Sequence, residues 1–124
     1  NLPNLNASLG CAQLDRFKNF LKQKRSLFAK YKKAFKNIKE VSILSEPQNC
    51  TSNYWLQTLI LKFPNIQLRN DILKYSAKNK ISTRPAWELM HYINYLKKFP
   101  KMNLENSEEM FKKIINLPSS SQLV

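Results

Sequence analysis

With 124 residues, 43% of them hydrophobic and 11% aromatic, the chain can fold as one domain with a modest core, and this composition excludes a disordered chain. No apolar run approaches the roughly 20 residues that a membrane-spanning helix needs. The formal net charge of +13 favours polyanionic partners, such as nucleic acid or phosphate-bearing small molecules. Lysine-rich coding bias would produce the same charge, so the charge alone does not identify a partner.

The first third of the chain predicts one long amphipathic helix over residues 6–38. Its apolar residues recur at alternating spacings of three and four, a pattern that Lys24 interrupts. The apolar stripe consists of Leu14, Phe17, Leu21, Phe28, Tyr31, Phe35 and Ile38. Gly10, the only glycine, lies in the first turns, where it costs about 1 kcal/mol relative to alanine. A close backbone contact or a break in the helix there would explain it.

Two strands are predicted next. Residues 41–44 (VSIL) favour a short strand, and residues 54–63 (YWLQTLILKF) favour a longer, central strand that Pro64 ends. Successive side chains of a strand point to opposite faces. One face of the longer strand would carry Tyr54, Leu56, Thr58 and Ile60, and the other would carry Trp55, Gln57, Leu59 and Leu61.

The second half of the chain alternates helices with one more strand. Residues 68–80 predict a helix with its apolar residues directed inward, namely Leu68, Ile72, Leu73 and Tyr75. Residues 81–85 (ISTRP) predict a third strand, and residues 89–99 a short helix. Asn106, with Glu109 three residues later, predicts the N-cap of a last helix that ends at Ile114.

This order of elements predicts an α+β domain. A small three-stranded sheet, antiparallel or mixed, would be packed by the long N-terminal helix and the shorter helices. There is no internal repeat and no linker long enough to separate two domains, so residues 1–124 are expected to form a single domain.

The sequence indicates no self-contained active site. One glycine excludes a glycine-rich phosphate loop. Cys11, Cys50 and His91 lack the spacing of metal ligands, and nothing places either cysteine beside His91 as a nucleophile pair. We therefore predict no catalytic residue and no metal. Without a secretory signal, the two cysteines are interpreted as reduced thiols of a cytoplasmic protein.

One short segment, ISTRPAWELMH at residues 81–91, gathers residue types that are rare elsewhere in the chain. Arg84, one of four arginines, lies beside a proline, and its planar guanidinium suits a carboxylate or a phosphate. Trp87 could stack on a ring, and His91, the only histidine, could donate or accept a hydrogen bond. The alternative is equally favoured by the residues alone: Trp87 and Met90 in the core, an ordinary hydrogen-bonded His91, and Arg84 paired with a surface acid.

The chain resembles the C-terminal small domain of the DegT/DnrJ/EryC1/StrS aminotransferases, and is most similar to their LegC-type branch. Four segments carry the resemblance in family order: LPNLNASLGCAQLDRF, SNYWLQTLIL, RNDILKYSAKNKISTRPAWELMH and IINLPSS. These enzymes use pyridoxal phosphate to aminate nucleotide-linked keto-sugars, with glutamate as the usual donor, in surface-polysaccharide or nonulosonic acid biosynthesis. The resemblance implies that a large upstream domain, absent here, holds most of the cofactor and the Schiff-base lysine. It also implies a homodimer, a nucleotide-sugar substrate, no membrane partner, and no activity for this chain alone.

The resemblance also implies which residues face the substrate. It assigns Arg84, Trp87 and His91 to the sugar-nucleotide side, with Arg84 on an anionic group, and Asn53 as a further candidate at the mouth of the second strand. In the family, an asparagine that binds the cofactor phosphate belongs to a motif just before LPNLN. Asn1 stands where the arginine of that motif would be, so the cofactor-binding residue is not assigned. The alternative function is a basic module that binds nucleic acid or another polyanion, although the resemblance does not favour a nucleic-acid partner.

Overall fold

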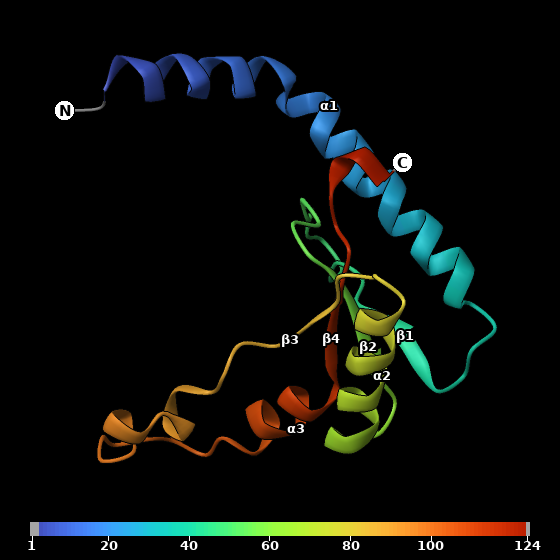
Figure 1. The fold of residues 1–124 in the computed structure, drawn as a ribbon, viewed down its shortest axis with the longest axis vertical. Coiled ribbons are helices and arrows are strands. Elements are labelled where there is room, and N and C mark those ends of the chain that lie inside the picture. Colours follow the sequence, from blue (N-terminus) through green and yellow to red (C-terminus); the bar gives the residue numbers. More distant parts are fainter. Residues whose placement is uncertain (1–2, 124) are drawn as a thin grey trace.

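A four-stranded antiparallel sheet and three α-helices make up residues 3–123, the part of the chain that the computed structural model describes (Figure 1). The predicted α+β class is confirmed. In chain order the elements are α1 (Asn4–Phe35), β1 (Val41–Ile43), β2 (Gln57–Leu61), α2 (Ile66–Lys78), β3 (Arg84–Pro85), α3 (Glu105–Lys113) and β4 (Ile114–Leu117). Short 3₁₀ turns occur at Met90–Tyr92, Asn94–Leu96 and Ser121–Leu123.

The sheet has the strand order β1-β2-β4-β3, so it contains one strand more than predicted. The additional strand is β4, which lies between β2 and β3 and pairs Ile115 with Leu59 and Asn116 with Arg84. The sequence pattern had assigned the start of this segment to the last helix. Its β-branched Ile114 and Ile115 instead pair with β2, because long-range pairing decides such a short segment.

The core lies on the sheet, where Ile43, Leu59, Leu61 and Ile115 are buried together. Along β2, Gln57, Leu59 and Leu61 are buried, and the residues between them are half-buried. The prediction that these three residues share one face of the strand is therefore confirmed. Three aromatic residues of the predicted α1 stripe pack against this core, together with two residues of α2: Phe28, Tyr31, Phe35, Ile72 and Leu73.

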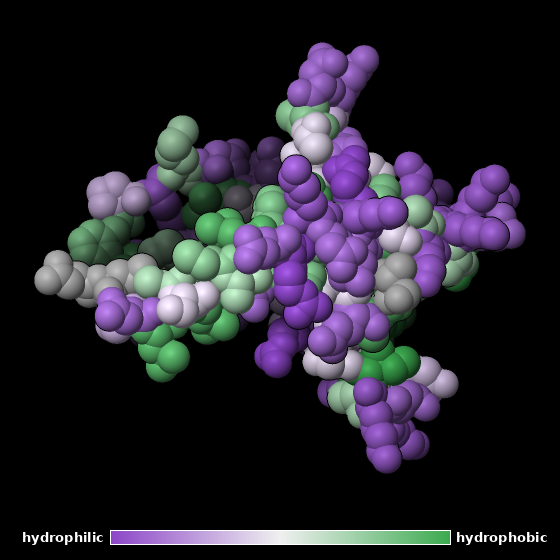
Figure 2. Space-filling view, turned by 90° about the horizontal axis from the view of Figure 1, so that it is seen from above, coloured by the Kyte–Doolittle hydropathy of each residue, from purple (hydrophilic) through white to green (hydrophobic). Residues whose placement is uncertain are grey.

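The N-terminal half of α1 projects away from the sheet (Figure 1). Leu14 and Phe17 of the predicted stripe are therefore exposed, and Figure 2 shows apolar residues gathered over this half of the helix. The explanation expected for Gly10 is wrong, because the helix is unbroken and a Cβ at Gly10 would meet no atom within 4 Å. The helix also ends at Phe35, and Ile38 is exposed beyond it.

Helix α2 presents a different face to the core from the one predicted. Ile72 and Leu73 point inward as expected, but Leu68 and Tyr75 are exposed. Arg69 is buried instead: its Nη1 donates to the carbonyl of Phe111 at 2.7 Å, and its guanidinium lies over the Phe111 ring. Because the buried Arg69 side chain is hydrogen-bonded to α3 and lies over one of its rings, α2 turns its Arg69 side toward the domain interior. Leu68 and Tyr75 consequently face outward.

The segment from β3 to α3 contains less regular structure than predicted. The third strand is reduced to Arg84–Pro85, and two 3₁₀ turns replace the helix expected over residues 89–99. Helix α3 begins at Glu105, so Asn106 lies inside it and is not its N-cap. The asparagine that hydrogen-bonds the start of α3 is Asn103, whose Oδ1 accepts from the Glu105 N–H at 2.9 Å. Within residues 3–123, no helix is both long and apolar enough to cross a bilayer.

Candidate functional site

Arg84 lies on an open cavity of about 400 Å³ at the β3 edge of the sheet. We call this the Arg84 cavity, and its walls include Leu56, Ser82, Arg84, Asn116, Ser119 and Ser120. Among residues 3–123, no hydrogen bond or ion pair involves the Arg84 guanidinium, so the predicted alternative of a surface acid partner is not present there. An uncompensated guanidinium beside three serines and an amide is suited to binding a phosphate or a carboxylate.

Trp87 is paired with a second tryptophan, Trp55, and neither of them lines the Arg84 cavity. Their ring centroids are 6.1 Å apart at an interplanar angle of 28°, and the residues are 72% and 64% exposed, respectively. Trp87 is therefore not a core residue. Trp55 immediately precedes Leu56, a wall residue of the Arg84 cavity. Two adjacent exposed tryptophans offer a surface on which a planar ring can stack.

Trp55 was not predicted as a site residue, because strand alternation had placed it on the same face as Gln57, Leu59 and Leu61. In the structure β2 begins only at Gln57, and Tyr54 has φ 47°. This left-handed backbone breaks the alternation and turns Trp55 outward. Asn53 has a local role here: its Oδ1 accepts from the Trp55 N–H at 3.0 Å.

His91 lies elsewhere. Its Nε2 is 2.9 Å from Oε1 of Glu108, and its side chain is only 12% exposed. It lines a separate apolar cavity of about 550 Å³ that Met90, Phe99 and Leu104 also line. His91 is thus absent from the walls of the Arg84 cavity, and its environment is that of a hydrogen-bonded histidine. Met90 is exposed, so the alternative that placed it in the core is wrong.

Lys24, which interrupts the apolar stripe of α1, faces the body of the domain. Its Nζ donates to the carbonyl of Trp55 at 3.0 Å and also to the carbonyl of Ser119. The amine thus joins the segment that carries Trp55 to a wall of the Arg84 cavity. Burial lowers the pKa of Lys24. The interruption in the stripe is therefore a polar contact between α1 and the candidate site.

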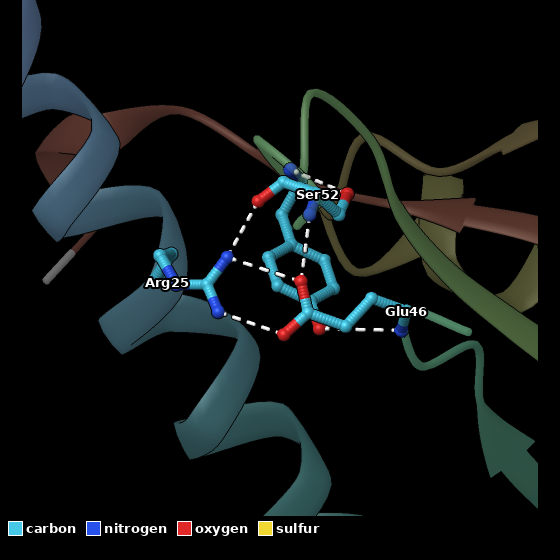
Figure 3. A network of polar contacts seen from close by, with 4 residues as sticks. Arg25, Glu46 and Ser52 are labelled. Atoms are coloured by element: carbon cyan, nitrogen blue, oxygen red, sulfur yellow. Dashed lines mark hydrogen bonds and ion pairs between the residues drawn. The ribbon is translucent and has the colours of Figure 1, made fainter. Parts of the chain in front are cut away.

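The neighbouring residue, Arg25, binds the segment between β1 and β2 (Figure 3). Its Nη2 and Nη1 lie 2.7 Å and 3.2 Å from the two carboxylate oxygens of Glu46, and Nη1 also donates to the carbonyl of Ser52 at 2.6 Å. The Ser52 N–H donates to Oε2 of Glu46 at 2.6 Å. The hydrogen bonds from Arg25 and from the Ser52 N–H hold the pKa of Glu46 below its usual value. Neither residue was predicted as functional.

We expect the stabilising effect of Glu46 to disappear in acid. Because the folded state lowers the pKa of this carboxyl group, its contribution is present above the usual carboxyl pKa and is lost as the pH falls through the lowered one. The difference in urea midpoint between the wild type and Glu46→Gln should therefore be constant near neutral pH and shrink in acid. Equal differences at about pH 7 and about pH 2 would contradict this.

The residues described do not make up a pyridoxal phosphate site. Such a site needs a lysine amine for the aldehyde and a carboxylate or comparable partner for the pyridinium nitrogen. The Arg84 cavity contains neither a lysine nor a carboxylate, and the separate apolar cavity that His91 lines contains Lys101 but no carboxylate. Among residues 3–123 there is also no group of three or more histidine, cysteine or acidic residues placed to hold a metal ion. Asn1, which stands where the arginine of the family's phosphate-binding motif would be, lies outside the described residues.

Comparison with known proteins gives consistent matches. The model of the DegT/DnrJ/EryC1/StrS aminotransferase family matches residues 1–124. The chain is 31% identical to EpsN of Bacillus subtilis (strain 168), whose name describes a pyridoxal phosphate-dependent aminotransferase. It is 27% identical to GDP-perosamine synthase of Escherichia coli O157:H7. Each alignment covers 98% of this chain and 32% of the relative, so the chain spans about a third of the length of these relatives.

Solved structures agree on the fold. Spr1654 of Streptococcus pneumoniae, described as a sugar aminotransferase and solved in its PMP form, superimposes with a TM-score of 0.86 at 22% identity. PseC of Helicobacter pylori, an aminotransferase involved in the biosynthesis of pseudoaminic acid, superimposes with a TM-score of 0.85 at 19% identity. These alignments cover 100% and 96% of this chain, respectively, and 32% of each of the other chains. This fold therefore occurs within larger aminotransferases.

Proposed function

The chain belongs to the DegT/DnrJ/EryC1/StrS aminotransferase family, and from this premise we propose that it is the C-terminal small domain of an enzyme that aminates a nucleotide-linked keto-sugar. The match over all 124 residues supports this proposal, as does the length of the chain, a third of that of its relatives. The basic polyanion-binding module is the less favoured alternative, because the family model accounts for the whole chain without it.

The observation that carries the proposal is the Arg84 guanidinium, which has no ion-pair partner among residues 3–123, on an open cavity whose wall residue Leu56 directly follows Trp55 of the exposed tryptophan pair. A nucleotide-linked sugar presents phosphate, planar base and sugar ring together. In the proposed function Arg84 binds the anionic group by paired N–H donors, and Trp87 stacks on a ring. The substrate-side roles of His91 and Asn53 stay predictions.

Amino transfer itself depends on the rest of the protein in this proposal. Glutamate is the proposed donor, and pyridoxal phosphate, when bound, supplies the electron sink for the reaction. In this proposal most of the residues that hold the cofactor belong to a large domain outside this chain, so the chain alone is inactive. We also propose a homodimeric, cytoplasmic enzyme. The TRPAWELMH segment supports a LegC-type enzyme of surface-polysaccharide or nonulosonic acid biosynthesis.

The cofactor requirement can be tested by absorbance. The full-length protein should develop the visible band of a lysine–pyridoxal imine when pyridoxal phosphate is added, and borohydride should convert that imine to a stable covalent adduct. With one equivalent of pyridoxal phosphate, the 124-residue chain should not show the band, because the Arg84 cavity and the cavity lined by His91 lack the necessary pair of groups; any borohydride adduct should be spread over its surface lysines and not confined to one of them. A folded full-length protein that forms no imine would contradict the proposed function.

A further inference from the structure

We propose that Arg25, Glu46 and Ser52 are positioning residues that hold the Trp55–Trp87 pair in place beside the Arg84 cavity. We call these three residues the clamp. The inference rests on the proposed function and extends it: the clamp determines how well the ring of a nucleotide-linked sugar is bound, and it takes no part in amino transfer from glutamate.

The segment that carries Trp55, residues 44–56 between β1 and β2, has a backbone that needs external support. Asn49 and Tyr54 have φ of 63° and 47°. A left-handed conformation is common for asparagine, but for a bulky residue such as tyrosine it is strained and persists only where the surroundings impose it. Tyr54 is buried, its ring stacks on Phe28 with centroids 4.0 Å apart, and the Arg25 guanidinium lies over it at 5.4 Å.

Through the clamp, α1 binds this segment near both of its ends. Glu46 lies near the start of the segment and Ser52 near its end, and Arg25 binds both of them at once. The Ser52 N–H returns a hydrogen bond to Glu46, so the three residues form a closed cycle (Figure 3). The Glu46 N–H also donates to the Tyr54 hydroxyl at 3.3 Å. A closed set of charge-assisted hydrogen bonds fixes geometry more firmly than a single surface ion pair does.

From Ser52 the constraint passes along the backbone to Trp55. The Tyr54 N–H donates to Oγ of Ser52 at 3.0 Å, and the Trp55 N–H donates to Oδ1 of Asn53 at 3.0 Å. Lys24 of α1 binds the Trp55 carbonyl. The Trp55 residue itself is largely exposed and stacks on Trp87. The direction of the indole therefore depends on a backbone that the clamp and Lys24 hold.

The contacts of Lys24 and the order of the chain link this tryptophan pair to the Arg84 cavity, although neither tryptophan lines it. Lys24 donates to the carbonyl of Ser119, a wall residue, as well as to that of Trp55. Leu56, the residue after Trp55, is another wall residue, and Trp87 follows Arg84 by three positions. A ligand that joins a planar ring to an anionic group can use both features, the ring on the indoles and the anion on the guanidinium. A nucleoside diphosphate sugar has this chemistry.

The clamp can be tested without any activity, because Trp55 and Trp87 are the only tryptophans of the 124-residue chain. Two stacked indoles give an exciton couplet in circular dichroism, and Trp87→Phe should abolish it. We expect Glu46→Gln to lose most of the couplet while the helical signal is unchanged, because the amide has no charge and only one acceptor oxygen, and in either orientation its NH₂ group would face an N–H of Arg25. The matched control is Glu109→Gln, which breaks a surface pair with Lys113 and should leave the couplet intact.

A second variant covers the case in which Glu46→Gln fails to fold. Arg25→Lys keeps the charge but removes the fork that binds Glu46 and Ser52 together, so it should lose the couplet as well. A wild-type couplet in a folded clamp variant would overturn the proposal.

A kinetic measurement on the full-length protein separates positioning from general destabilisation. Glu46→Gln should raise KM for the nucleotide-linked sugar about tenfold, since it removes part of a stacking contact, and should leave the rate of the glutamate half-reaction unchanged. Equal losses in both half-reactions would show that the clamp merely supports folding, and would overturn the proposal. If the wild type aminates no sugar, the proposed function fails, and the couplet still decides whether the clamp positions the tryptophans.

Discussion

In the full-length protein, Arg84→Gln is expected to lower kcat/KM for the nucleotide-linked sugar by about 10- to 100-fold. A hydrogen bond to a charged group contributes about 1.5–3 kcal/mol, and each 1.4 kcal/mol corresponds to a factor of ten. The Arg84 guanidinium has no ion-pair partner among residues 3–123, so its donors are available to the ligand. Because Arg84 is exposed, the substitution should leave the free energy of unfolding nearly unchanged.

Two further variants make this prediction specific. Arg84→Lys keeps the charge without the planar fork, so it should retain part of the affinity. Arg16→Gln alters an arginine on the projecting half of α1, where the guanidinium lies over the Phe20 ring, and it should have no effect on kcat/KM. Steady-state kinetics with saturating glutamate measures all three variants. Wild-type kcat/KM for Arg84→Gln would remove Arg84 from the substrate site.

The largest effect on stability is expected from Ile115→Ala, which should lower the free energy of unfolding by about 2–5 kcal/mol. Ile115 is 0% exposed and lies in β4 between Leu59 of β2 and Pro85 of β3. Removing three buried carbon atoms here leaves a cavity that strands paired on both sides cannot easily close. Because small domains are stable by only about 5–15 kcal/mol, the variant would be marginal.

Ile81→Ala is the matched control, because it deletes the same atoms from a residue that is 48% exposed. Its effect should be well below that of Ile115→Ala. Urea unfolding followed by circular dichroism gives both values. Similar midpoints for the two variants would show that β4 is not the centre of the core.

The α+β class and the core contacts of α1 were predictable because they depend on local periodicity. Phe28, Tyr31 and Phe35 keep the helical spacing and reach the core as predicted. Strand β4 was not predictable in the same way. Its four residues directly follow α3, and only pairing with β2, which is distant in the sequence, makes them a strand.

The candidate site shows the same distinction. Arg84 and Trp87 were predicted as substrate-side residues through the family resemblance of their segment, because the residue types alone left their roles open. Trp55 was missed because the positive φ of the preceding Tyr54 ends the strand alternation there. A positive φ can be anticipated at a glycine or an asparagine but not at a tyrosine. Arg25 and Glu46 are 21 positions apart and come from different elements, so no spacing rule connects them.

The most direct test of the proposed function is the amination of a nucleotide-linked keto-sugar, followed by mass spectrometry. The full-length protein with pyridoxal phosphate should convert the keto group to an amine and glutamate to 2-oxoglutarate in equal amounts, whereas the 124-residue chain should convert neither. A full-length protein that binds pyridoxal phosphate yet aminates no sugar nucleotide would contradict the account, as would a 124-residue chain that catalyses the reaction alone.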